Sequence, residues 1–74
     1  MASVEKLIKK MKNQPNGISP QEGGQVLAAY GYAMLRQRGS HRSYRNSAGE
    51  MVVIVADNPL KAAYVKEILQ RINQ

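Results

Sequence analysis

Hydrophobic residues recur at helical spacing near both ends of the chain. Near the start, an amphipathic helix is predicted by apolar side chains at positions i, i+3, i+4 and i+7: Val4, Leu7, Ile8 and Met11. Ser3 is its expected N-cap, and the NQPNG run at 13–17 is expected to end it. The same spacing near the end predicts a last helix through Val65, Ile68, Leu69 and Ile72. The lysines of the first helix are interpreted as a solvated face.

A third helix has a clear start signal. Ser19, Pro20 and Glu22 form a capping box with proline at the first helical position. We expect this helix to run to Tyr30, with Gly31 just beyond its end, and to bury its apolar face: Val26, Leu27 and Tyr30. Two glycines at 23 and 24 weaken it by about 1 kcal/mol each relative to alanine.

Between the second and last helices the pattern becomes extended. Strands are predicted at 32–38, 41–46 and 51–55, with tight turns at Gly39-Ser40 and at 46–49. Alternation predicts that Arg36 and Arg38 share a face with Tyr32 and Met34. In the second strand, alternation puts one set of side chains on one face of the sheet, His41, Ser43 and Arg45. It puts Arg42 and Tyr44 on the other face. The continuous apolar run MVVIV predicts the best-buried strand.

The predicted order of helix, helix, three antiparallel strands and helix defines an α+β fold with helices packed on one face of a small sheet. Seventy-four residues are enough for one domain. We expect residues 1–74 to form it, with 1–17 as an extra N-terminal helix and turn and 18–74 as the core.

Composition narrows the class of protein. Cysteine is absent, so disulfides and thiolate metal sites are excluded, which fits a reducing cytoplasm. The charged N-terminus is unlike a signal peptide, and no apolar run is long enough to span a membrane. We therefore expect an intracellular, cytoplasmic domain. The net charge of +6 favours a polyanionic partner.

The positive charge is concentrated in the segment LRQRGSHRSYRN, residues 35–46. Four arginines in it surround the only histidine, His41: Arg36, Arg38, Arg42 and Arg45. No acidic residue occurs between Glu22 and Glu50. Guanidinium groups bind phosphate, and an imidazole transfers protons near neutral pH. The segment therefore predicts RNA binding and RNA cleavage, with Tyr44 either stacking on a base or packing in the sheet.

Other chemistries have weaker support. One histidine and scattered carboxylates do not supply a transition-metal ligand set, so no metal and no cofactor is expected. Ser40 and Ser43 flank His41 without a nearby carboxylate or a nucleophile-elbow pattern. RNA cleavage needs fewer groups, because the 2′-hydroxyl is the nucleophile. A positioned histidine then contributes about 10²–10⁴-fold, although a single histidine beside a turn is more often an ordinary surface residue.

The motif Gly39-Ser40-His41, preceded by Arg36-Gln37, resembles the HicA-type (YcfA-like) toxins of bacterial toxin–antitoxin pairs. The resemblance spans Ser19 to Ile72, including AYGYAMLRQRGSHRSYRN, MVVIV and NPLKAAYVKEIL. It implies a fold like that of double-stranded-RNA-binding domains, ribonuclease activity on mRNA, and inhibition by a HicB-type antitoxin protein. It also implies that His41 is catalytic and that the Gly39 turn positions it.

The chain departs from this pattern at two places. Arg42 replaces a second histidine found in many relatives, which keeps the positive charge. Ala56-Asp57-Asn58 replaces a proline with basic or histidine residues, which removes cations from the expected RNA surface and adds an acid. RNA affinity or substrate choice is therefore expected to differ.

The sequence supports three hypotheses. The first is a metal-independent endoribonuclease toxin, with His41 as general acid or base and an RNA-binding set made of Arg36, Arg38, Ser40, Arg42, Tyr44 and Arg45. The second is a non-catalytic RNA-binding module that recognises duplex shape. The third is an interaction subunit whose basic face meets an acidic protein. Only the first makes His41 indispensable.

Overall fold

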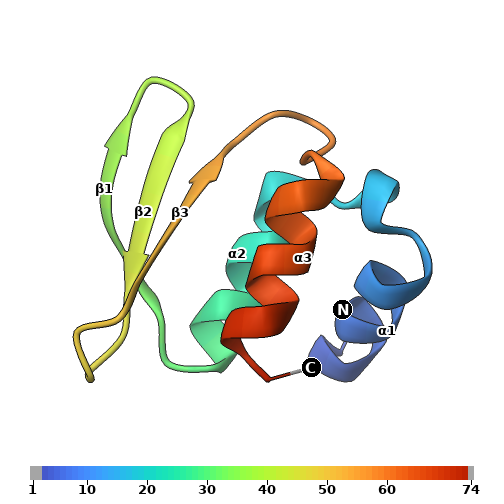
Figure 1. Ribbon diagram of the computed structural model, residues 1–74, viewed down its shortest axis with the longest axis horizontal. Helices are drawn as coiled ribbons and strands as arrows, with labels where there is room; N and C mark the ends of the chain where they lie inside the picture. Colours follow the sequence, from blue (N-terminus) through green and yellow to red (C-terminus); the bar gives the residue numbers. More distant parts are fainter. Residues whose placement is uncertain (1–2, 74) are drawn as a thin grey trace.

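The computed structural model describes residues 3–73, which form three α-helices, a short 3-10 helix and a three-stranded sheet (Figure 1). The expected α+β fold, with the order α-α-β-β-β-α, is confirmed. The elements are α1 (Val4–Asn13), η1 (Pro15–Gly17), α2 (Pro20–Ala29), β1 (Ala33–Arg38), β2 (His41–Arg45), β3 (Met51–Val55) and α3 (Ala62–Arg71). The strands pair antiparallel in the order β1-β2-β3, so β2 is central.

Local signals place the helix boundaries. The Ser3 hydroxyl accepts a hydrogen bond from the Lys6 backbone N–H, which caps α1 as predicted. At the start of α2, the Ser19 hydroxyl accepts from the Glu22 N–H at 3.1 Å, and the Glu22 carboxylate accepts from the Ser19 N–H at 3.0 Å. The predicted capping box is therefore complete. Gly31, with φ of 88°, reverses the chain after α2.

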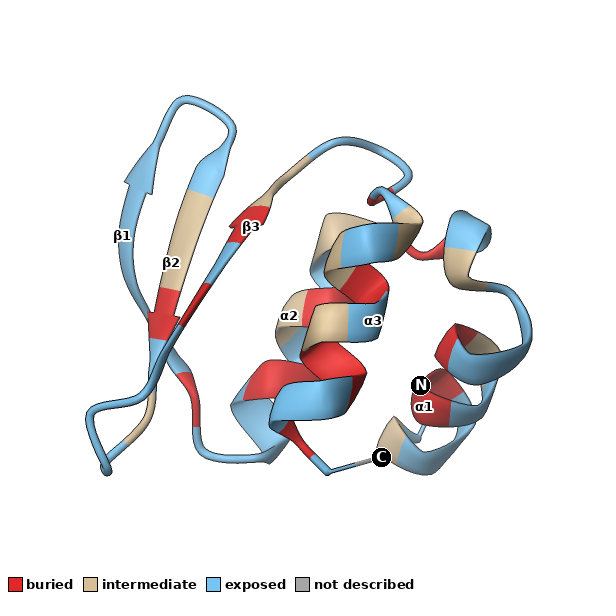
Figure 2. Cartoon of the chain, in the orientation of Figure 1, coloured by how far each residue is buried: buried red, intermediate tan, exposed pale blue. Residues whose placement is uncertain are grey.

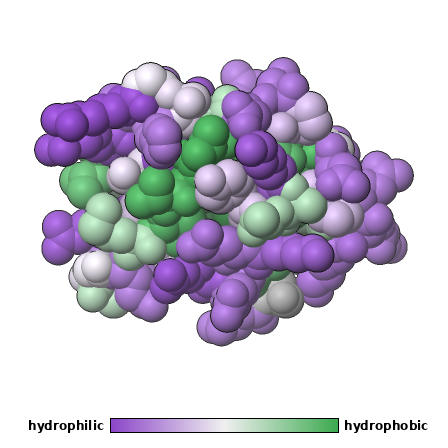
Figure 3. Space-filling model, turned by 45° about the horizontal axis from the view of Figure 1, so that its top comes forward, coloured by the Kyte–Doolittle hydropathy of each residue, from purple (hydrophilic) through white to green (hydrophobic). Residues whose placement is uncertain are grey.

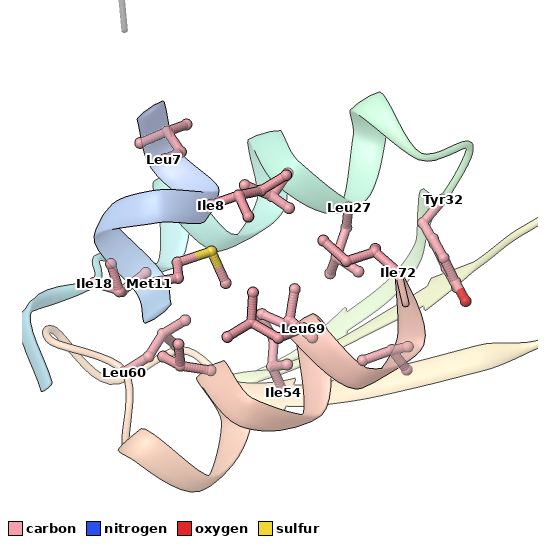
Figure 4. Packing of buried hydrophobic residues seen from close by; sticks show 14 of the residues in the cluster. Leu7, Ile8, Met11, Ile18, Leu27, Tyr32, Ile54, Leu60, Leu69 and Ile72 are labelled. Atoms are coloured by element: carbon pink, nitrogen blue, oxygen red, sulfur yellow. The ribbon is translucent and has the colours of Figure 1, made fainter. Parts of the chain in front are cut away.

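A single hydrophobic core joins all three helices to one face of the sheet (Figure 4). Every apolar residue used to predict the last helix is buried, and so are Leu7, Ile8 and Met11 of α1. Val52 and Ile54 of β3 are fully buried, whereas the intervening Val53 is 44% exposed. As predicted, β3 is the best-buried strand, but it is buried on one face only (Figure 2).

One predicted core residue is wrong. Tyr30 is 42% exposed, and Tyr32 is buried instead at 5%. The reason is that α2 ends at Ala29, so Tyr30 is its C-cap and no longer follows the buried stripe. The Tyr32 N–H donates to the Leu27 carbonyl at 2.9 Å, which folds the chain back and brings Tyr32 into the core.

The two glycines of α2 are contact positions. A Cβ on Gly24 would lie 2.9 Å from the Tyr44 hydroxyl, and a Cβ on Gly23 would lie 3.0 Å from Leu60 Cδ1 and 3.2 Å from Ile68 Cδ1. All three distances are shorter than ordinary van der Waals contacts. The helix-weakening glycines are therefore the points where α2 meets β2 on one side and α3 on the other.

This contact predicts a thermodynamic coupling between Gly24 and Tyr44. Alanine at position 24 would gain about 1 kcal/mol in helix propensity, but overpacking against the Tyr44 hydroxyl, 2.9 Å from the new Cβ, costs about 1–3 kcal/mol. We expect Gly24→Ala to be neutral or destabilising in the wild type and stabilising in a Tyr44→Phe background. Urea unfolding of the four proteins of this double-mutant cycle measures the coupling; additive effects would contradict the contact.

The capping box also predicts an acid-sensitive contribution to stability. The hydrogen bond from the Ser19 backbone N–H, followed by that from the Lys10 side chain at 2.9 Å, holds the pKa of Glu22 below its ordinary value of 4.5. A lowered folded-state pKa stabilises the fold above about pH 4.5, and this contribution is lost as pH falls through the folded-state pKa. Glu22→Gln should therefore flatten the pH dependence of the unfolding free energy below pH 4.5. An unchanged slope in acid urea titrations would exclude Glu22 as the source.

Candidate nucleic-acid interface

The helices cover one face of the sheet, and the opposite face is free of helices (Figure 1). We call this second side the open face. The strand register assigns residues to it, because directly paired residues point to the same side of a sheet. Tyr44 pairs with Val52, and both are buried under the helices. Successive residues of a strand point to opposite sides, so the residues directly before and after Tyr44 and Val52 lie on the open face.

The residues of β2 and β3 on the open face are His41, Ser43, Arg45, Met51, Val53 and Val55. The sequence prediction for β2 is confirmed, because His41, Ser43 and Arg45 share one side while Arg42 and Tyr44 share the other. His41 pairs with Val55, and Ser43 pairs with Val53.

The side predicted for two β1 arginines is wrong. Arg36 pairs with Ser43 and Arg38 with His41, so both arginines lie on the open face. Met34 pairs with Tyr44 on the helix side. Leu35 is an extra residue between the Met34 and Arg36 pairs, a β-bulge that shifts the alternation by one position. The sequence gives no direct signal of this bulge, because regular alternation would put Tyr32, Arg36 and Arg38 on one side, and only the burial of Tyr32 at 5% shows that it lies opposite the arginines.

The hairpin between β1 and β2 brings His41 opposite Arg38. Gly39 has a positive φ of 55° at the first position of the two-residue turn, a conformation that glycine adopts without strain. Direct cross-strand partners have Cβ atoms about 5 Å apart. The turn therefore starts the His41 and Arg38 side chains from neighbouring positions on the same side of the sheet, with Arg36 further along that side of β1.

The segment after β3 is attached to the tip of this hairpin. The Ala56 N–H donates to the Ser40 carbonyl at 2.6 Å, so the chain leaves β3 beside the turn. Asp57, the acid noted as a departure from the HicA-type pattern, is two residues beyond Val55, the partner of His41. The hydrogen bond from Ala56 to Ser40 joins segments that are distant in the sequence, and no sequence pattern signals it.

The remaining candidate residues are not gathered around His41. Arg45 is at the other end of β2, with its guanidinium near the turn at Gly49, where a Cβ would lie 3.8 Å from Arg45 Nη2. Tyr44 is 6% exposed in the core, so its ring packs and does not offer a face for stacking.

Arg42 lies on the helix side in a shallow depression shared with Tyr44 and α2. Its Nε is buried and has no hydrogen-bond partner in the part of the chain that the structure describes.

The cations of the open face have no carboxylate partners among residues 3–73. The ion pairs found there join Lys10 to Glu22 at 2.9 Å and Arg71 to Glu67 at 3.8 Å, both in the helical layer. Arg36, Arg38 and Arg45 are all exposed. The positive charge of this face is therefore available to an anion from solution. In the view of Figure 3 most of the surface is hydrophilic, with apolar atoms gathered in a central patch.

Within 3–73, no group of three or more histidine, cysteine or acidic side chains converges as a metal site. No helix of the described chain is long and apolar enough to cross a membrane. Comparison with known proteins gives no assignment either, since no family model, no curated protein and no solved structure matches the chain.

Proposed function

We propose that the chain is a metal-independent endoribonuclease that cleaves mRNA, a HicA-type bacterial toxin of the cytoplasm that a HicB-type antitoxin neutralises. One observation carries this proposal. His41, the only histidine, is on the open face directly opposite Arg38, with Arg36 adjacent and no carboxylate pairing with either arginine among the described residues. A proton-transfer group beside unpaired cations is what phosphodiester cleavage requires.

The chemistry follows from this pair of groups. When the ribose 2′-oxygen attacks the adjacent phosphorus, a 2′-O–P bond forms, the P–O5′ bond breaks, and a 2′,3′-cyclic phosphate and a 5′-hydroxyl result. His41 takes the proton from the 2′-hydroxyl and water protonates the leaving 5′-oxygen, or His41 protonates the 5′-oxygen and water takes the 2′ proton; in either case the proton lost at 2′ is balanced by the one gained at 5′. Arg38 is placed to bind the phosphate oxygens, where its guanidinium stabilises the charge that develops in the transition state.

The other candidate residues have secondary roles in this proposal. Arg36 and Arg45 bind the RNA backbone along the open face. Gly39 sets the turn that places His41, and Ser40 anchors the segment of Asp57 through its carbonyl. Arg42, on the far side of the sheet, is available only to RNA that passes around the hairpin or the edge of β1.

The alternative is a non-catalytic RNA-binding module. The observation that favours it is that Arg36 and Arg45 are presented to solvent without any contribution from His41. The two hypotheses share the same arginines and differ in whether the imidazole is needed.

His41→Ala tests catalysis. We expect wild-type protein to cleave a single-stranded mRNA fragment in EDTA, and His41→Ala to lose about 10²–10⁴-fold in rate while it retains RNA binding and thermal stability. Ser47→Ala, an exposed serine in the β2–β3 turn, is the matched control and should cleave at the wild-type rate. Mass spectrometry should find a 2′,3′-cyclic phosphate on the products.

The outcomes separate the hypotheses. Cleavage by His41→Ala at the wild-type rate would refute the assignment of this residue. Loss of all cleavage when EDTA is added would refute metal independence. RNA binding without cleavage by any of the three proteins would support the binding module instead.

Arg36→Gln tests backbone binding. We expect a several-fold weaker affinity for RNA and a decrease of about one in the slope of log K against log salt, because one phosphate contact is lost. Arg71→Gln removes the same charge from α3, where the arginine is paired with Glu67. Filter-binding titrations at several salt concentrations should show an unchanged slope for this control. Equal effects of the two variants would mean that only net charge matters.

A further inference from the structure

The open face is ordered into columns of different chemistry, one on each strand. The column on β1 is basic, with Arg36 and Arg38. The column on β2 is mixed, with a polar pair next to the turn, His41 and Ser43. The column on β3 is entirely apolar, with Met51, Val53 and Val55. The register aligns these columns in three rows across the sheet. Two rows run from basic through polar to apolar: Arg38, His41 and Val55, then Arg36, Ser43 and Val53. In the third row Met51 lies directly beside the cation of Arg45, which pairs with Ala33 on β1.

Two of the apolar side chains are open to solvent. Met51 is 45% exposed and Val53 is 44% exposed. Single exposed apolar residues are common on protein surfaces and need no partner. Here, however, the two residues are next to each other in one column, and the column runs parallel to unpaired arginines two strands away. Phosphate binding alone does not require such an apolar column.

We propose that Met51 and Val53 form a platform on which unpaired RNA bases lie, while the phosphates follow the arginines of β1. This inference rests on the proposed function and adds the orientation of the substrate. Two strand spacings separate the basic from the apolar column, about 10 Å, which is comparable to the reach of a nucleotide from its phosphate to the outer edge of its base. The ribose then lies over the middle column, beside His41 and Ser43.

A paired RNA cannot use this platform. In an A-form duplex the bases are stacked on one another, and the duplex offers proteins mainly its phosphates and 2′-hydroxyls. Unpaired bases can instead be splayed out onto a protein surface. Cleavage makes the same demand, because in-line attack by the 2′-oxygen requires the ribose to leave its helical conformation. The three columns therefore select a single strand.

The test compares two methionines on opposite sides of the sheet. In the His41→Ala protein, which we expect to bind without cutting, Met51→Thr and Val53→Thr should each weaken binding of a short single-stranded RNA by about fivefold to tenfold, near the lower end of what a base stacked on an aromatic side chain contributes. Met34→Thr is the control, because Met34 is similarly exposed, at 53%, but lies on the helix side of β1. It should leave the affinity unchanged.

A second measurement reports on the bases directly. Single-stranded RNA should shift the NMR signals of the Met51 and Val53 methyl groups upfield, because these methyls would lie under aromatic rings. A hairpin that pairs the same bases should bind more weakly, leave these methyl signals in place, and be insensitive to Met51→Thr.

Each other outcome has a definite meaning. Equal loss of affinity in Met51→Thr and Met34→Thr, or equal loss for single-stranded and hairpin RNA, would overturn the platform while RNA binding by the arginines stands. Methyl shifts caused by an acidic peptide but not by RNA would assign the column to a protein partner and would also overturn it. Absence of binding to any RNA would instead refute the proposed function itself.

Discussion

The arrangement of this small fold depends on the close approach of α2 to β2 and α3 at two consecutive glycines. Because Gly24 has no Cβ, the Tyr44 hydroxyl can approach the α2 backbone more closely than any other residue would allow. Gly23 allows the side chains of Leu60 and Ile68 the same close approach. Tyr44 is the residue of the central strand β2 that is buried in the core. Because α2 contacts the centre of the sheet and α3 in the same helical turn, both helices are held on one side of it.

This one-sided packing explains why the other side of the sheet is open. The apolar residues of α1 join the same core and pack against α2 and α3, so this helix is not available to cover the second face. All three helices of the described chain are thus used on one side. The open face keeps the strands' outward residues in water, and those residues include the histidine and three of the four clustered arginines.

Interactions between near neighbours in the sequence could be predicted well. The Ser3 cap, the Ser19–Glu22 capping box, the helical spacing of apolar residues and the Gly39-Ser40 turn each involve groups a few residues apart, so the sequence contains all the information needed to place them. The glycine contacts and the Ser40–Ala56 hydrogen bond join distant segments and left no recognisable pattern. The expectation that Tyr30 is buried is wrong for a related reason, since helical spacing holds only as far as Ala29, where α2 ends.

The bulge at Leu35 shows how a local irregularity determines the candidate site. The turn pairs Arg38 with His41, and regular pairing back from the turn would put Tyr32 on the open face together with Arg36 and Arg38. One extra residue turns Tyr32 into the core, where its ring is buried, and leaves both arginines outside. No two arginines become direct partners, because Arg36 faces Ser43, Arg38 faces His41 and Arg45 faces Ala33. Like charges directly opposite each other destabilise a sheet. Because this register avoids such pairs, the sheet can carry three arginines on one face with little loss of stability. Their positive charge then remains available to attract an anionic ligand.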